Sequence, residues 1–291
     1  MEASQVKYKS ARQVTMSEIQ IPLRKLNSGR TATIFKYTGE QVLKVFRSTF
    51  PQEAIDEEYK IGLYLNNVDL DIPLTYSRKD GYDSRTIVFE YIPGKSMLQK
   101  LASAPWKVFI YSKQMARLHA RIHSIHASDS DLSSLKESLT NKISRVSLLN
   151  PDERKIIISH LLRLKDGNAI CHGDFHPDNI IVTENRMVTV DWITARIGNP
   201  VADVARTWLL LAMGTLPENK TKLEVALATY LRDLFCSLYV KEYRRLTQFN
   251  VEEFEAWKLP IAAARLIENV SLQENETLLK FIRMRIASTS L

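Results

Sequence analysis

Two hydrophobic periods divide this chain, and they occupy separate parts of it. In the first ninety residues, apolar side chains alternate with polar ones or form short runs, a pattern typical of β-strands, over residues 31–37, 41–46 and 85–91. Further along, apolar residues recur at helical spacing over residues 106–125, 151–164, 201–213 and 223–243. This segregation predicts an α+β fold with a small antiparallel sheet lobe and a larger, mainly helical lobe.

Turn-forming residues set the connections between these elements. Residues 38–40, Thr-Gly-Glu, predict a hairpin turn between the first two strands. A helix is expected after Pro51, because acidic residues fill its first turns and apolar ones recur behind them. Pro93 and Gly94 end the third strand. We therefore expect the lobes to comprise residues 1–92 and 93–291.

One segment of the helical half has the pattern of strands. Apolar residues 180–182 and 187–190 flank the polar residues 183–186. This arrangement predicts a β-hairpin embedded among helices.

Composition limits the classes of protein to which the chain can belong. Its 291 residues are 45% hydrophobic, enough for a large core, and contain only two cysteines, which fits a reducing compartment. Residues 1–15 are polar and lack the apolar segment of a signal peptide. The densest apolar run, residues 207–213, is far shorter than the roughly 20 residues that cross a bilayer. We expect a soluble cytoplasmic protein without membrane contact.

The chain is basic, with 40 Lys and Arg against 33 Asp and Glu and a formal charge of +7. Such an excess of positive charge can favour binding to nucleic acid or another polyanion. However, the positive residues are scattered, and the best cluster is small: Lys241, Arg244 and Arg245. Without a basic stripe interleaved with aromatic residues, a solvated surface is favoured over a nucleic-acid interface.

The most informative residues lie just before and after the predicted hairpin. His172, Asp174 and Asn179 have the spacing His-x-Asp-x-x-x-x-Asn, and Asp191 follows the second strand. Phosphoryl transfer to a hydroxyl needs a carboxylate that orients the hydroxyl and accepts its proton, and oxygen ligands for Mg²⁺. Asp174 fits the first role. Asn179 and Asp191 fit the second, because the hairpin folds back and brings position 191 beside position 179. Turn formation alone would not explain this spacing.

These residues resemble the aminoglycoside phosphotransferase and choline kinase family, whose members have a protein-kinase-like fold. The resemblance covers nearly the whole chain. The protein-kinase pattern itself is not met, because Gly173 stands in place of the catalytic-loop Arg and residues 191–193 read Asp-Trp-Ile in place of Asp-Phe-Gly. Only eleven residues, 192–202, separate Asp191 from Asp203, which leaves no room for an activation loop. The resemblance therefore implies a small-molecule kinase.

The resemblance makes residues 1–92 the nucleotide-binding lobe and 93–291 the lobe with the catalytic loop and the acceptor site. Lys44 stands where the family has the lysine that holds the nucleotide phosphates. The following helix should present a Glu to orient it. Glu58 is favoured, because it lies one and two turns before apolar residues of the expected inward face, but Glu57 stays open.

Two further segments of the first lobe are implied to meet the nucleotide. Ser28, Gly29 and Thr31 fall where the family has its phosphate-covering loop, and their backbone amides would reach phosphate. The segment has a single glycine, so the Gly-x-Gly-x-x-Gly pattern is absent and an ordinary strand-connecting turn is the alternative. Glu90 and Ile92 fall at the family's hinge, where main-chain groups would grip adenine.

Other residues are implied to support the catalytic loop. His172 and Asp203 take structural roles, with Asp203 expected as a buried carboxylate that accepts hydrogen bonds from loop amides or from His172. Three histidines at positions 119, 123 and 126 share a helix face. The zinc-protease motif needs Glu after the first, where this chain has Ala120, so packing or surface histidines are favoured over metal ligands.

The resemblance implies an ATP-dependent phosphotransferase that uses ATP and Mg²⁺, with a nucleotide and a small-molecule acceptor as partners, as a monomer or homodimer. Aminoglycosides, choline, homoserine and methylthioribose are all compatible with the same loop. Residues 252–276 are locally acidic, and the apolar residues 259–267 should pack Glu268 near the cleft edge. We expect Glu268 to hold a cationic acceptor. The alternatives are a catalytically silent relative that binds nucleotide as a regulatory module, and a nucleic-acid-binding protein.

Overall fold

A computed structural model describes residues 23–76, 84–127, 132–214, 221–268 and 270–289 of the chain. Its residue contacts divide into two compact units, Met1–Pro93 and Gly94–Leu291. The polar segment 1–15, where the sequence predicts no signal peptide, lies outside the described residues.

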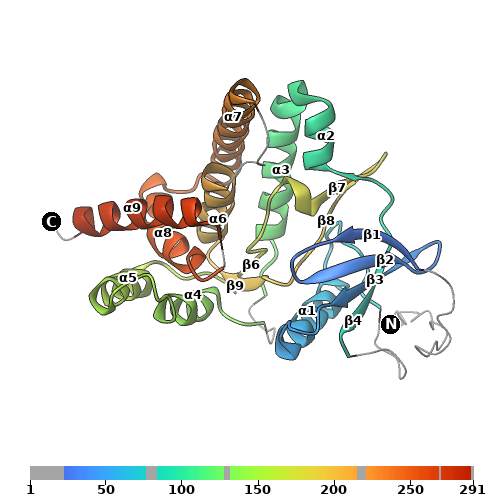
Figure 1. The fold of residues 1–291 in the computed structure, drawn as a ribbon, viewed down its shortest axis with the longest axis horizontal. Coiled ribbons are helices and arrows are strands. Elements are labelled where there is room, and N and C mark those ends of the chain that lie inside the picture. The colour runs from blue at the N-terminus through green and yellow to red at the C-terminus, as the bar shows by residue number, and fades with distance from the viewer. Residues whose placement is uncertain (1–22, 77–83, 128–131, 215–220, 269, 290–291) are drawn as a thin grey trace, which may run out of the picture. The chain divides into compact units, whose positions relative to one another are not determined.

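The first unit is built on a four-stranded antiparallel sheet in the order β1-β2-β3-β4 (Figure 1). The strands are β1 (Arg24–Ser28), β2 (Ala32–Lys36), β3 (Gln41–Phe46) and β4 (Thr86–Glu90). The predicted hairpin turn joins β2 to β3, with the Tyr37 amide donating to the Gln41 carbonyl at 3.0 Å. Strand β1 was not predicted, because it is exposed throughout and has a single apolar residue. Pairing with β2, not burial, therefore holds it.

One helix, α1 (Gln52–Leu65), completes the first unit. It begins directly after Pro51, as the sequence predicts. Its buried residues recur every three or four positions, and one of them, Glu58, is charged. They are Ile55, Glu58, Ile61, Gly62 and Leu65. A carboxylate on an otherwise apolar face needs a partner, which β3 supplies.

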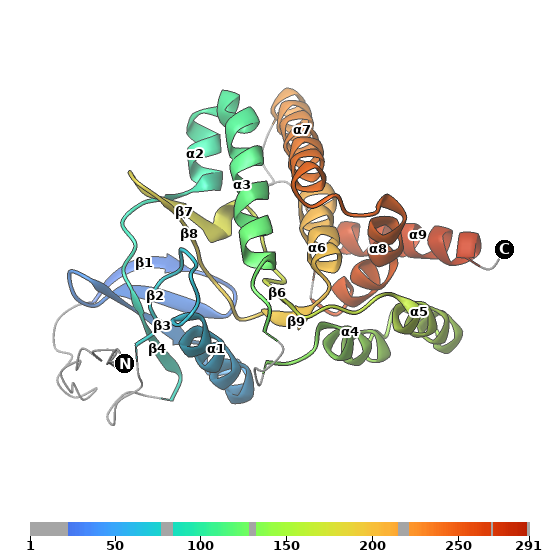
Figure 2. The same cartoon turned by 180° about the vertical axis from the view of Figure 1, so that it is seen from behind.

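The second unit is mainly helical (Figure 2). Helix α3 packs along α7, and α6 packs against α8. Helix α6 is buried on most of its surface and so forms the centre of the unit. The helices are α2 (Met97–Ser103), α3 (Val108–His123), α4 (Leu135–Ser144), α5 (Pro151–Arg163), α6 (Pro200–Met213), α7 (Lys222–Thr247), α8 (Val251–Arg265) and α9 (Leu272–Thr289).

Two small antiparallel sheets lie among these helices. One has the order β5-β7-β8 and the other joins β6 to β9. Their strands are β5 (Lys95–Ser96), β6 (Ala169–Cys171), β7 (Ile180–Val182), β8 (Met187–Thr189) and β9 (Arg196–Gly198). The predicted hairpin is therefore present as β7 and β8. The segment from β6 to β7 carries the His-x-Asp-x-x-x-x-Asn residues and includes the short 3-10 turn η3 (Pro177–Asn179).

The fold class predicted from the sequence is confirmed, with a small antiparallel sheet and a larger helical part. In the part of the chain that the structure describes, every helix is too short or too polar to cross a membrane.

Candidate active site

Asp174 lies in the loop between β6 and β7, which its own neighbours close. The amide nitrogen of Asn179 donates to the Asp174 carbonyl at 2.9 Å and lies 3.3 Å from the carboxylate Oδ2. The Asp174 backbone N–H donates to His172 Nδ1 at 3.2 Å. Residues two positions before and five positions after Asp174 thus fix its backbone, which is why the motif spacing matters.

The hairpin brings Asp191 next to this loop. The Val190 amide donates to the Asn179 carbonyl at 3.0 Å, and His172 Nε2 donates to the Val190 carbonyl at 3.1 Å. Asp191 follows directly, with φ at 66°. A left-handed backbone is uncommon outside glycine, although Asp tolerates it better than most residues. The structure therefore places two oxygen-bearing side chains, Asn179 and Asp191, on neighbouring strand ends.

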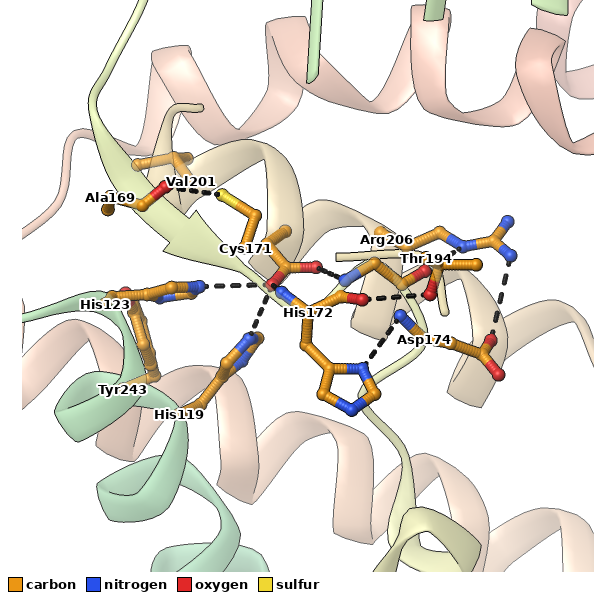
Figure 3. A network of polar contacts seen from close by, with 12 residues as sticks. His119, His123, Ala169, Cys171, His172, Asp174, Thr194, Val201, Arg206 and Tyr243 are labelled. Atoms are coloured by element: carbon orange, nitrogen blue, oxygen red, sulfur yellow. Dashed lines mark hydrogen bonds and ion pairs between the residues drawn. The ribbon is translucent and has the colours of Figure 1, made fainter. Parts of the chain in front are cut away.

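The turn at Gly173 admits no side chain. Its φ is 77°, and a Cβ there would lie 2.6 Å from the Thr194 carbonyl oxygen. The Thr194 hydroxyl donates to the His172 carbonyl at 2.9 Å (Figure 3). A larger residue would push apart the two segments that position Asp174.

Asp203, in the first turn of α6, lies beneath the loop. Its Oδ2 accepts the His172 amide at 2.5 Å, and its Oδ1 accepts the Gly173 amide at 2.9 Å. Of the two partners that the sequence left open for this carboxylate, the structure brings it to the loop amides. The His172 side chain is turned away toward Val190.

Cations hold Asp174 as a carboxylate. Burial alone would raise the pKa of Asp174, but the hydrogen bond and charge of His176, together with Arg206, hold it below its ordinary range. His176 Nε2 lies 3.4 Å from Asp174 Oδ2, and an Arg206 nitrogen lies 3.8 Å from Oδ1. A deprotonated carboxylate with 29% of its side chain exposed can accept a proton from a bound hydroxyl.

His176 and Arg206 were not predicted as site residues from the sequence. Besides facing Asp174, Arg206 Nε donates to the Gly173 carbonyl at 3.1 Å. A signal was available for each: His176 lies inside the motif, and Arg206 lies one helical turn after Asp203 and so shares its face.

Glu268 lies just after α8 among three cations. Its carboxylate is 2.7 Å from Arg206, 2.6 Å from Arg265 and 3.5 Å from Lys142. Burial raises the pKa of Glu268, but these charges outweigh it and lower the pKa to about 2. A cavity of about 30 Å³ adjoins Glu268 and Gly173. Small-molecule sites are roughly 300–1,000 Å³, so this cavity is much smaller than a typical sugar-binding site.

In the first unit, Lys44 of β3 and Glu58 of α1 form a buried ion pair. Their Nζ and Oε1 atoms are 2.6 Å apart, and the two residues are 7% and 2% exposed. Glu57, the alternative, is only half-buried. The pair has the geometry that holds a phosphate-binding lysine in kinases.

The predicted phosphate-covering residues form the turn between β1 and β2. The Ser28 amide donates to the Asn27 side chain at 2.8 Å, and the Gly29 amide donates to the Ala32 carbonyl at 2.9 Å. A phosphate would have to displace these bonds to reach either amide. Thr31 directly precedes β2.

The predicted hinge residues lie at the end of β4. The Glu90 amide donates to the Leu74 carbonyl at 2.8 Å, so this N–H is already used within the unit. Ile92 follows β4 and precedes the division between the two units at Pro93.

Residues 22–269 match the phosphotransferase enzyme family, whereas no curated protein sequence matches the chain. Many solved structures are similar in fold. The ADP-bound aminoglycoside phosphotransferase APH(2'')-Ib is 19% identical, with a TM-score of 0.56 over 93% of this chain and 94% of that one. Amicoumacin kinase hAmiN, in complex with AMP-PNP, Ca²⁺ and Ami, is 13% identical, with a TM-score of 0.56 over 92% and 90%.

A thermostable mutant of aminoglycoside phosphotransferase APH(4)-Ia is 13% identical, with a TM-score of 0.63 over 92% of this chain and 95% of that one. At such identities the likeness shows the kinase-like fold alone. The family match spans most of the sequence and includes the closed loop around Asp174. The chain therefore belongs to the phosphotransferase enzyme family.

Proposed function

We propose that this protein is an ATP-dependent phosphotransferase that moves the γ-phosphate to a hydroxyl of a small molecule. Asp174 orients the acceptor hydroxyl and accepts its proton. Transfer then depends chiefly on positioning and charge neutralisation. Residues 1–92 bind the nucleotide, and residues 93–291 carry the catalytic loop and the acceptor site.

The observation that carries this proposal is the hydrogen-bonded register of the catalytic loop. Asn179 bonds to both the backbone and the carboxylate of Asp174, and its own carbonyl pairs with Val190, directly before Asp191. A base and two oxygen donors are thereby held in one rigid segment. Turn formation requires none of these three side chains.

Asn179 and Asp191 fit a magnesium ion. Both offer oxygen, the ligand atom that Mg²⁺ prefers, and the Val190 hydrogen bond fixes them as neighbours. The strained φ of Asp191 is typical of a functional position. When bound, the ion would neutralise charge on the nucleotide phosphates.

Lys44 is proposed to hold the nucleotide phosphates, with Glu58 orienting it. The buried 2.6 Å pair supports these roles, because an ammonium group held at one position needs no rearrangement when phosphate arrives. Ser28, Gly29 and Thr31 would cover the phosphates, and Glu90 and Ile92 would meet the base through their main chains.

The acceptor is proposed to be an aminoglycoside-like or other alcohol, cationic ones included. The similar structures include a streptomycin–ATP–APH(2")-IIa ternary complex and a gentamicin–APH(2")-IIa complex. Those antibiotics are ligands of those proteins, and here they define the first compounds to screen. A panel of cationic alcohols, sugars and antibiotics, assayed for acceptor-dependent ADP release, would identify the acceptor.

Substitution of Asp174 tests the proposed chemistry. Asp174→Asn should abolish transfer while leaving ATP affinity nearly unchanged, because Asn can neither accept the proton nor carry the charge. General base catalysis contributes about 10²–10⁴-fold, so retention of more than about a tenth of wild-type turnover would contradict the assignment. Asp152→Asn, at an exposed position on α5, is the matched control.

The alternative is a catalytically silent relative that binds nucleotide as a regulatory module. The same assay separates the two functions, because a silent relative would bind ATP without releasing ADP in the presence of any acceptor.

A further inference from the structure

The interior of the helical unit contains two parallel hydrogen-bonded chains that end on one carboxylate. Tyr239 OH lies 2.6 Å from His119 Nδ1, and His119 Nε2 lies 3.0 Å from Asp203 Oδ2. One helical turn further on, Tyr243 OH lies 2.6 Å from His123 Nδ1, and His123 Nε2 lies 3.2 Å from the same oxygen. We call these pairs the two tyrosine–histidine chains. Figure 3 shows both imidazoles, His119 and His123, directed at one point beside His172.

The protons in this network have one consistent arrangement. An ionised carboxylate only accepts hydrogen bonds, so both Nε2 atoms donate to Asp203. A neutral imidazole carries one N–H, so Nδ1 of a neutral His119 accepts and the Tyr239 hydroxyl donates, and His123 and Tyr243 repeat this geometry. Burial and the neighbouring His123 lower the pKa of His119 to about 3, which keeps it neutral. Burial also raises the pKa of both tyrosines, so they keep their protons.

Asp203 connects the two tyrosine–histidine chains to the catalytic loop. Besides the two imidazoles it accepts the His172 and Gly173 amides, the two peptide groups directly before Asp174. The His119 ring also stacks on Phe175, the residue after Asp174, with centroids 4.1 Å apart. The base is thus flanked on both sides by groups that the network holds.

Packing of the helices does not by itself require buried tyrosine and histidine side chains. A buried hydroxyl or imidazole is unfavourable unless it is hydrogen-bonded, and leucine or phenylalanine would fill the same space without that requirement. A fully connected network fixes the direction of every member. The Asp203 carboxylate is therefore held in one orientation, which apolar packing could not achieve.

A metal site is the competing interpretation, because His119 Nε2, His123 Nε2 and an Asp203 oxygen all lie within 4.8 Å of one another. Zinc takes four protein ligands in structural sites, or three and a water molecule in catalytic sites, whereas this cluster offers three ligands and all of them are buried. Its carboxylate oxygen is also occupied by the His172 amide at 2.5 Å. The hydrogen-bonded arrangement satisfies these atoms without an ion.

We propose that the two tyrosine–histidine chains are positioning elements of the catalytic loop: they fix the Asp203 carboxylate, which in turn holds the backbone that carries Asp174. Their kinetic effect rests on the proposed phosphotransfer. Their effect on the loop does not.

The test removes only the two hydroxyl groups. In the double variant Tyr239→Phe/Tyr243→Phe both rings remain, and Tyr230→Phe, at an exposed position of the same helix, is the matched control. In the wild type, ¹⁵N NMR of the histidine side chains should show the neutral Nε2–H tautomer for both chain histidines. In the double variant the His172 and Gly173 amides should exchange with solvent about tenfold faster, while amides of α8 stay protected.

Turnover gives the second readout. The double variant should lose about tenfold in kcat with less than a twofold change in either KM, because the loop is displaced while the binding groups stay. The proposal is overturned if loop and α8 amides exchange alike, if the wild-type histidines show Nδ1–H or are protonated at pH 7, or if one equivalent of zinc binds and shifts their resonances. Wild-type protein without transferase activity would instead contradict the proposed function, and the exchange experiment would still decide the role of the chains.

Discussion

At the scale of single residues, Asp174 interacts with Arg206, a group that lies outside its motif. Arg206 faces the carboxylate at 3.8 Å and also holds the Gly173 carbonyl, while Glu268 holds Arg206 at 2.7 Å. The expectation from the sequence, that Glu268 binds a cationic acceptor, stays a prediction. The structure also suggests a second role, because three cations already surround this carboxylate and one of them, Arg206, lies 3.8 Å from Asp174.

Glu268→Gln separates these two roles. Loss of the charge that holds Arg206 should lower kcat several-fold and leave the acceptor KM within about twofold, because the change acts through Asp174. Glu274→Gln is the matched control, since Glu274 pairs with Arg265 at 2.9 Å and belongs to the same cluster. Steady-state kinetics decide the matter: a raised acceptor KM with unchanged kcat would support the acceptor-binding role instead.

Asp191→Ala tests the proposed magnesium ligand. A magnesium ion held by Asn179 and Asp191 would lose its carboxylate ligand, so both Mg-ATP affinity and turnover should fall by at least about tenfold. Isothermal titration calorimetry with Mg-ATP measures the affinity. The same titration with ATP in EDTA gives the metal-free reference. Equal affinity of wild type and variant in the presence of Mg²⁺ would show that Asp191 acts only as a turn residue.

At the scale of elements, an ion pair joins α1 to β3 in the first unit. Lys44 and Glu58 are nearly inaccessible to water, and they meet on faces that are otherwise apolar. Such a pair gives little net stability relative to apolar side chains, but loss of one partner leaves an uncompensated buried charge. Retention of charge at this contact therefore fits a functional lysine better than a purely structural contact.

Glu58→Gln should destabilise the first unit by about 3–5 kcal/mol, because the Lys44 ammonium would stay buried without its counter-charge. Urea unfolding monitored by circular dichroism measures the change, with Glu57→Gln at the adjacent, half-buried position as the control. Similar losses from the two substitutions would contradict the structural assignment. A raised KM for ATP in Lys44→Met would give independent support for the nucleotide role.

At the scale of the whole molecule, the buried network makes stability depend on pH. The pKa of His119 is about 3 in the folded chain, against an ordinary value of 6.5. Below pH 6.5 the unfolded chain therefore binds a proton at His119 that the folded chain does not bind. The contribution of neutral His119 to the free energy of unfolding is complete above about pH 6.5 and is lost as the pH falls from there toward 3. This is the direction that linkage requires when the unfolded state binds more protons.

Measurement of the free energy of unfolding as a function of pH checks this effect. The free energy of unfolding should fall with decreasing pH below 6.5, with His119 contributing at most about 1.4 kcal/mol per pH unit. His119→Asn, which has no titratable group, should show a smaller slope between pH 6 and 4.5, as measured by urea unfolding at each pH. Parallel slopes for wild type and variant would show that His119 is protonated in the folded protein.

Local interactions explain how much of the structure could be predicted from the sequence. Hydrophobic periods gave the helices α3, α5, α6 and α7 and the strands β2, β3 and β4 to within a few residues, because period and turn chemistry act over neighbouring positions. The hairpin that brings Asp191 to Asn179 followed for the same reason. Strand β1 could not be predicted, since it depends on pairing with β2 and carries almost no apolar pattern of its own.

Contacts between distant positions could be decided only by the tertiary structure. The sequence places His119 and His123 on one helix face but cannot supply their partners, because each tyrosine lies 120 positions away along the chain. The Arg206–Glu268 contact likewise joins residues 62 positions apart. Such pairs form only when α3 packs along α7 and α6 packs against α8. The sequence by itself thus determined the elements and the contiguous catalytic loop, while helix packing decided which buried groups hold that loop in place.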